Sequence, residues 1–206
     1  MLDKFISVLL LSMLTLPISC ELNNSNTQIR EDKVKLENEQ QGLRRLADAL
    51  SQKMNNKRLD SNIVLENFTS GEKKKIAEIL KTGEMCVLQY SELNCNICVD
   101  SAVSRFKQFI DEIGKEHAII IAATKNPRYM ISFVQLNRLQ HDNVYMIDYA
   151  GFEKLYGKSE NMPFVYMINN SFNISDCFYP FKEIPEYSDT YYTTMYKKYF
   201  EEKHLK

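Results

Sequence analysis

The chain has 206 residues, of which 26% are charged and 44% are hydrophobic. These values are typical of a globular protein with one ordinary domain, extensions, and enough mass to bury a core. With 26 basic and 27 acidic residues the formal net charge is -1, and no basic stripe is present. The sequence therefore lacks the electrostatic pattern of nucleic-acid-binding proteins, and we expect no nucleic-acid partner.

The first twenty residues have the organisation of an export signal. A short charged start ends at Lys4, and an apolar stretch over residues 5–16 leads to Pro17-Ile18-Ser19-Cys20. At about a dozen residues, the stretch is too short to span a bilayer as a mature helix. We interpret residues 1–19 as a signal peptide. The cysteine after a small residue resembles the lipobox of bacterial lipoproteins, which implies that Cys20 is lipidated; secretion without lipid and an uncleaved anchor are the alternatives.

Export places the mature chain in an oxidising compartment, where a disulfide can persist. We expect the chain in the bacterial cell envelope, lipid-anchored to a membrane and facing the periplasm or the surface. Residues 20–30 are polar and rich in Asn, so we interpret them as a flexible tether.

Residues 31–60 are predicted to form an amphipathic helical extension. Glu, Lys, Gln, Arg, Leu and Ala dominate its sequence, and these residues favour helix. Leu43, Leu46, Ala47, Leu50 and Met54 recur at helical spacing and form one apolar stripe. We expect this stripe to pack on the domain that follows; a stalk or a dimerising coiled coil is the alternative.

Residues 61–206 alternate between strand-like and helix-like segments. The pattern calls for one mixed sheet that is covered by helices on both faces. The expected strands cover residues 62–68, 85–90, 117–123, 143–148, 164–168 and 172–179, and the expected helices cover residues 72–81, 99–113, 128–139, 152–156 and 186–204.

The segment Cys95-Asn96-Ile97-Cys98 lies between a predicted strand and a predicted helix. Thiols on the first turn of a helix meet unpaired backbone N–H groups and the positive end of the helix dipole, and both favour thiolate. Two thiols at this spacing can close a small disulfide ring. The spacing indicates a redox dithiol, which the oxidising compartment favours over half of a zinc site or two buried cysteines.

Three features carry a resemblance to the thioredoxin superfamily, and most closely to the TlpA-like membrane-anchored thiol-disulfide oxidoreductases. They are the strand and loop of residues 86–98, the apolar strand of residues 117–123, and Met162-Pro163-Phe164. The resemblance implies an α/β, thioredoxin-like fold with a central mixed β-sheet flanked by helices, here with an N-terminal helical extension.

The resemblance also implies roles for individual residues. Cys95 would be the exposed nucleophile and Cys98 the resolving thiol, and they would exchange disulfides by way of a mixed disulfide. Pro163, after a cis peptide bond, would place the backbone of Met162 beside Cys95 to position a substrate strand. The partners would be thiols and disulfides of envelope proteins and a membrane or periplasmic reductant. No prosthetic cofactor and no metal are implied.

The chain departs from the pattern of this superfamily around the dithiol. Asn94 replaces the usual Trp, Asn96-Ile97 is an unusual intervening pair, and Gln89 takes the place of a buried acid or Asn. Gln forms hydrogen bonds but cannot accept a proton at neutral pH. A non-catalytic thioredoxin-like lipoprotein that acts as an interaction module therefore remains the alternative function.

The remaining cysteines and histidines are expected to have no part in the chemistry. Cys86 and Cys177 fall on strands that a third strand separates, about 9–10 Å apart, which is beyond disulfide reach. We expect two buried thiols. His117, His141 and His204 have no evident route to the dithiol, so we interpret them as solvated.

Overall fold

The computed structural model describes residues 16–80, 83–124, 126–139, 143–156 and 162–201; the side chains of residues 16–27 and 154–156 lie outside this description. The chain divides into two compact units, Met1–Gly42 and Leu43–Lys206. Most of the predicted signal peptide lies outside the described residues, as does the side chain of Cys20. The signal peptide and the lipidation of Cys20 therefore stay predictions.

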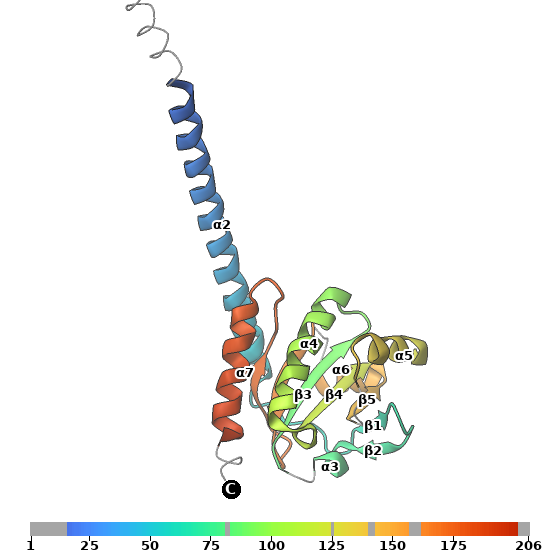
Figure 1. Cartoon of the computed structure of the whole chain (residues 1–206). Helices are drawn as coiled ribbons and strands as arrows, with labels where there is room; N and C mark the ends of the chain where they lie inside the picture. Colours follow the sequence, from blue (N-terminus) through green and yellow to red (C-terminus); the bar gives the residue numbers. More distant parts are fainter. Residues whose placement is uncertain (1–15, 81–82, 125, 140–142, 157–161, 202–206) are drawn as a thin grey trace, which may run out of the picture. The chain divides into compact units, whose positions relative to one another are not determined.

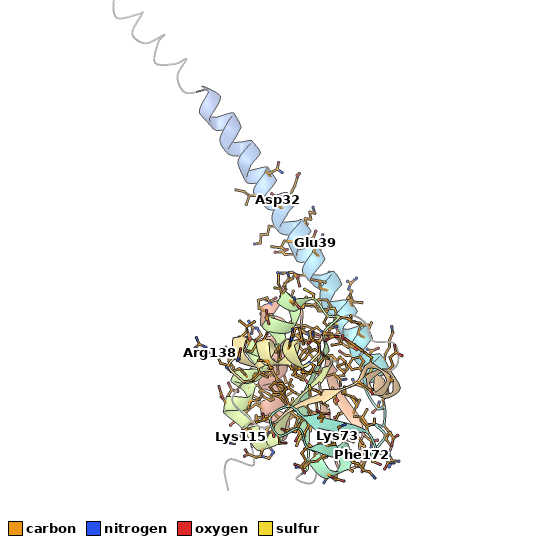
Figure 2. The ribbon with its side chains drawn as sticks, turned by 90° about the vertical axis from the view of Figure 1, so that its right-hand side faces the viewer. Asp32, Glu39, Lys73, Lys115, Arg138 and Phe172 are labelled. Atoms are coloured by element: carbon orange, nitrogen blue, oxygen red, sulfur yellow. The ribbon has the colours of Figure 1, made fainter. Side chains whose placement is uncertain are left out.

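The described part of the first unit is helical. Helix α2 (Leu16–Met54) includes residues 20–30, so the prediction of a flexible tether there is wrong. The segment contains no Pro or Gly, and extending an existing helix by one residue is far easier than starting a new one. Side chains around Asp32 and Glu39 point outward from the helix (Figure 2), in a stretch that is exposed throughout.

The last turns of α2 belong to the second unit. Ala47, Leu50 and Met54 are buried in its core, so the predicted packing of the apolar stripe is confirmed for these residues. Leu46, however, is 46% exposed. Leu46 lies about 60° around the helix from Leu43, at the margin of the stripe. The helix ends at Met54 rather than at residue 60, because Asn56 adopts a left-handed backbone conformation with φ of 68°.

The seven strands of the described residues form one mixed sheet, with the order β2-β1-β5-β4-β3-β6-β7 (Figure 1). The three central strands β3, β4 and β5 are parallel, and β6 and β7 continue the sheet in antiparallel fashion. The strands are β1 (Val64–Asn67), β2 (Lys73–Lys75), β3 (Met85–Ser91), β4 (Ala118–Ala123), β5 (Val144–Ile147), β6 (Phe164–Ile168) and β7 (Ile174–Phe178).

Helices cover both faces of the sheet, as predicted. The core on one face includes side chains from α4, α5 and α7, and α4 packs against β3 (Figure 1). The core on the other face includes the end of α2, α3 and α6. These helices are α3 (Ile76–Ile79), α4 (Asn96–Ile113), α5 (Pro127–Leu136), α6 (Tyr149–Tyr156) and α7 (Pro185–Tyr199), and a 3-10 turn, η1 (Lys115–His117), precedes β4.

The segment after β1 differs from the prediction of one helix that ends at residue 81. Asn67 Oδ1 accepts hydrogen bonds from the backbone amides of Thr69 and Ser70, and Gly71 adopts a φ of 68°. These features make a turn that folds β2 back onto β1. The three lysines of β2 therefore lie on an edge strand, where charged side chains discourage further strand pairing, and only α3 is helical.

The other predicted elements are confirmed with shifts of a few residues at their ends. β3 and β4 are buried along their whole length. α4 buries the apolar face predicted for it and ends at Gly114, which has a φ of 89°. The tyrosines of α7 pack on the core through Tyr191 and Tyr192. Within the described chain, no helix is long and apolar enough to cross a membrane.

Candidate active site

The loop between β3 and α4 is held in place by hydrogen bonds to its own backbone. The side chain of Asn94, which is 5% exposed, accepts a 2.7 Å hydrogen bond from the Ser91 amide. The Ser91 hydroxyl in turn accepts a hydrogen bond of 3.1 Å from the Leu93 amide. Asn94 therefore fixes the conformation of the chain just before Cys95.

Cys95 is the N-cap residue of α4, and its sulfur is exposed. A hydrogen bond from the Cys98 thiol lowers the pKa of Cys95, and the backbone amides of Cys98 and Ile97 act in the same direction without making a regular capping bond. Helix N-termini favour thiolate for this reason. The structure thus places the predicted nucleophile where a thiolate is stabilised.

Cys98 lies one turn into the helix and is partly buried. Burial raises the pKa of Cys98 to about 11, with a further contribution from its hydrogen bond to Cys95. Both residues are free thiols in this structure. The arrangement therefore combines an exposed, readily ionised thiol with a second thiol that keeps its proton at neutral pH.

Met162 and Pro163 lie at the same end of the sheet as Cys95. Gln89 pairs with Phe164, so β6 begins beside the carboxyl end of β3. Pro163 is buried and Met162 is partly exposed. The predicted cis bond before Pro163 is wrong, because no peptide bond between described residues is cis. The trans form is the intrinsically preferred one for X-Pro bonds.

A turn after β7 also reaches this end of the sheet. Because β7 is antiparallel to β6, and β6 to β3, the carboxyl ends of β7 and β3 point the same way. Lys182 and Glu183 are exposed on this turn, and Lys182 lies within electrostatic reach of both thiols. No sequence motif marks these two residues. The predicted sheet order alone would have placed the end of this strand beside the dithiol.

Comparisons with solved structures identify the fold. A candidate thiol:disulfide interchange protein DsbE from Chlorobium tepidum superposes with a TM-score of 0.51 at 11% identity, covering 67% of this chain and 96% of that chain. The chain has a thioredoxin fold. A candidate protein disulfide isomerase from Bacteroides thetaiotaomicron gives a TM-score of 0.50 at 11% identity, over 71% of this chain and 92% of that chain.

A PrxQ variant from Xylella fastidiosa also gives a TM-score of 0.50, at 9% identity, covering 69% of this chain and 95% of that chain. No family model matches the sequence, and comparison with curated proteins finds no significant match. At such low identity the superpositions establish the thioredoxin fold, and the prediction of this fold is confirmed.

In the dithiol loop of this thioredoxin fold, Glu92 forms hydrogen bonds with residues at the end of β4. Its carboxylate accepts a hydrogen bond from the Thr124 hydroxyl, and its amide donates one of 3.1 Å to the Ala123 carbonyl. Burial and the nearby Glu92 carboxylate raise the pKa of Tyr149. Glu92 thus anchors the loop to the neighbouring parallel strand.

Gln89 is fully buried on β3 and accepts a hydrogen bond of 3.2 Å from the Tyr166 hydroxyl. Its side-chain nitrogen makes no hydrogen bond in this structure. Gln89 thus places a neutral amide, hydrogen-bonded to a tyrosine, behind the dithiol, and an amide does not take up a proton at neutral pH.

The other cysteines whose side chains the structure describes are buried and lie apart. Cys86 on β3 and Cys177 on β7 are buried free thiols with β6 between them, as predicted. Burial raises the pKa of both thiols, that of Cys177 to about 12. Among the described residues, no group of three His, Cys, Asp or Glu side chains is arranged to hold a metal ion; His141 and His204 lie outside those residues.

Proposed function

We propose that this chain exchanges disulfides with envelope proteins through Cys95 and Cys98. The observation that supports the proposal is that the pKa values of the two thiols shift in opposite directions. Cys95 is exposed with a lowered pKa, whereas Cys98 is partly buried with a pKa of about 11. A nucleophile must be thiolate to attack, while a resolving thiol must stay protonated until the mixed disulfide has formed.

In the reductive direction the Cys95 thiolate attacks one sulfur of a substrate disulfide. The S–S bond breaks, and the other sulfur leaves as a thiolate with the electron pair. Cys98 then loses its proton and attacks Cys95 in the mixed disulfide. A Cys95–Cys98 disulfide forms and the second substrate sulfur leaves, so that two electrons pass to the substrate. A membrane or periplasmic dithiol reductant returns the chain to its reduced form.

The same proposal includes the location. An export signal with Cys20 as a lipidated first residue would hold the chain at a membrane of the bacterial envelope, with its dithiol domain facing the periplasm or the surface. Incorporation of labelled lipid tests this part. We expect it in the wild-type chain and not in Cys20→Ala, and labelling that survives the substitution would contradict lipidation at Cys20.

Two observations favour the second candidate, a non-catalytic interaction module. Gln89 cannot take a proton from the resolving thiol, and the bond before Pro163 is trans rather than cis. In that case the dithiol would be structural, and it would remain oxidised or inert.

One experiment separates the two functions. The reduction potential of the Cys95/Cys98 pair is measured against glutathione, and insulin-disulfide turnover is measured for wild type and Cys95→Ser. We expect turnover that Cys95→Ser abolishes, and a mixed disulfide with insulin that accumulates in Cys98→Ser. A dithiol that glutathione cannot reduce, together with no turnover, would support the interaction module and contradict exchange.

A further inference from the structure

The turn of Lys182 and Glu183 lies at the dithiol end of the sheet and is anchored on both sides. Phe181 and Ile184, which flank the two charged residues, are buried, and the Ile184 amide donates a 3.2 Å hydrogen bond to the Phe181 carbonyl. The Tyr187 amide then donates to the Ile184 carbonyl as α7 begins. Because its neighbours are fixed in the core, the turn presents Lys182 to solvent at a constant place.

Among the residues that the structure describes, the ion-pair partner of Lys182 is a weak one. Its Nζ lies 3.8 Å from Glu183 Oε1, and both side chains are substantially exposed. An exposed pair at this distance stabilises a protein little, so the ammonium group is available to other anions. The cation favours the thiolate of Cys95 and of Cys98, and Glu183 disfavours that of Cys98.

Two exposed apolar side chains border Cys95 within the dithiol segment. Leu93 is 68% exposed and Ile97 is 63% exposed. A polypeptide whose disulfide approaches Cys95 past these side chains would displace water from them. Charges interact more strongly as the effective dielectric falls, so a docked polypeptide would sense Lys182 more strongly than a small solute would.

We propose that Lys182 makes Cys95 select disulfides in acidic surroundings, so that polypeptides with Asp or Glu beside the half-cystine react faster than those with Lys or Arg there. This inference rests on the proposed exchange reaction. The reaction itself is unchanged: the Cys95 thiolate forms a bond to one substrate sulfur, and the other substrate sulfur leaves as a thiolate. Lys182 is a specificity-determining residue that touches the flank of the substrate.

The test compares two synthetic disulfide-linked peptides that differ only in Asp or Lys next to each half-cystine. Rates of reaction with the reduced full-length chain in uncharged detergent are measured at low ionic strength, and neutral 2-hydroxyethyl disulfide serves as the reference. A change in the thiolate fraction of Cys95 scales all three rates equally. The ratio of the rate with the Asp peptide to the rate with the Lys peptide therefore measures only the selection between the two peptides.

We expect Lys182→Gln to lower this ratio roughly 3- to 10-fold, Lys182→Glu to lower it further, and Glu183→Gln to raise it. Added salt should reduce the wild-type ratio, because screening weakens interactions between exposed charges. Lys197→Gln is the matched control: it removes an exposed lysine near the far end of α7, and it should leave the ratio at its wild-type value.

Three results would overturn the proposal in distinguishable ways. If wild type reacts with all three disulfides and Lys182→Gln keeps the wild-type ratio, the selection by Lys182 is wrong and the exchange reaction stands. If Lys197→Gln changes the ratio as much as Lys182→Gln does, the change in ratio arises from the net charge of the protein, and the proposed role of Lys182 is wrong. If wild type is as inert as Cys95→Ser toward every disulfide, the proposed function fails and this inference fails with it.

Discussion

Cys95 and Cys98 are joined by a hydrogen bond across the first turn of α4, and their pKa values move apart. The bond and the helix amides lower the pKa of Cys95, while burial and the same bond raise that of Cys98 to about 11. Two residues with the same side chain thus have different chemistry because one lies at the cap of the helix and the other lies inside its first turn.

The first prediction is that the native chain shows one reactive thiol in its dithiol domain. Alkylation of Cys95 should rise with pH, with a midpoint below the value of a free cysteine, about 8.5, because the pKa of Cys95 is lowered. Cys98 should begin to react only as pH approaches 11. Peptide mapping by mass spectrometry after alkylation at each pH measures both profiles.

Cys86 and Cys177 are the internal controls for this measurement, because both are buried with raised pKa values. They should label only after unfolding. Equal labelling of Cys95 and Cys98 at neutral pH would contradict the assignment of the nucleophile.

The second prediction concerns the packing of α2. Leu50 is 3% exposed whereas Leu46, four residues earlier on the same helix, is 46% exposed. Leu50→Ala should lower the free energy of unfolding by about 2 to 5 kcal/mol through lost burial and the cavity that remains. Leu46→Ala should change it by less than about 1 kcal/mol. Urea unfolding followed by circular dichroism tests the pair, and equal losses would mean that the end of α2 does not pack as described.

The third prediction concerns the carboxylate of Asp176 on β7. Partial burial opposes its ionisation, but hydrogen bonds from Lys198 and Tyr199 on α7 overcome that cost and lower the pKa of Asp176. Asp176→Asn should lower the free energy of unfolding at pH 7 by about 1 to 3 kcal/mol. Asn is the suitable replacement because the residue has a φ of 49°, which Asn also tolerates.

The pH dependence of this effect follows from the sign of the shift. The lowered pKa means that the carboxylate stabilises the fold at every pH above its unfolded-state value, and that this contribution is lost as pH falls through the folded-state value. Wild type and Asp176→Asn should therefore converge in stability at strongly acidic pH. Asp111→Asn removes an exposed carboxylate on α4 and serves as the control for the change in net charge.

The fourth prediction concerns the loop that leads into the dithiol. Asn94→Ala removes the acceptor of the Ser91 amide and should lower the free energy of unfolding by about 1 to 3 kcal/mol, because a buried N–H is left unsatisfied. Hydrogen exchange of the Ser91 amide should accelerate. Asn96→Ala, on the exposed first turn of α4, should change neither quantity, and an unaltered Ser91 amide in Asn94→Ala would contradict the anchoring role.

Local patterns predicted most of the sheet correctly because its strands are strongly marked. Residues 118–123 form an unbroken apolar run, which only a strand covered on both faces accommodates. The dithiol was found for a similar reason, since two cysteines at a strand–helix junction are a local feature. Residues 73–75 were predicted to be helical but form β2. This segment has no apolar periodicity of its own, and its pairing with β1 decides its conformation.

By itself, then, the sequence determined the thioredoxin fold, the position of Cys95 at the start of a helix, and the separation of Cys86 from Cys177. The tertiary structure decided which charges surround the dithiol. Lys182 is 87 positions beyond Cys95 in the sequence and reaches the thiols only because two antiparallel pairings bring the end of β7 back to the carboxyl end of β3. Electrostatic interactions depend on distance through space, and the pairing of the strands sets that distance.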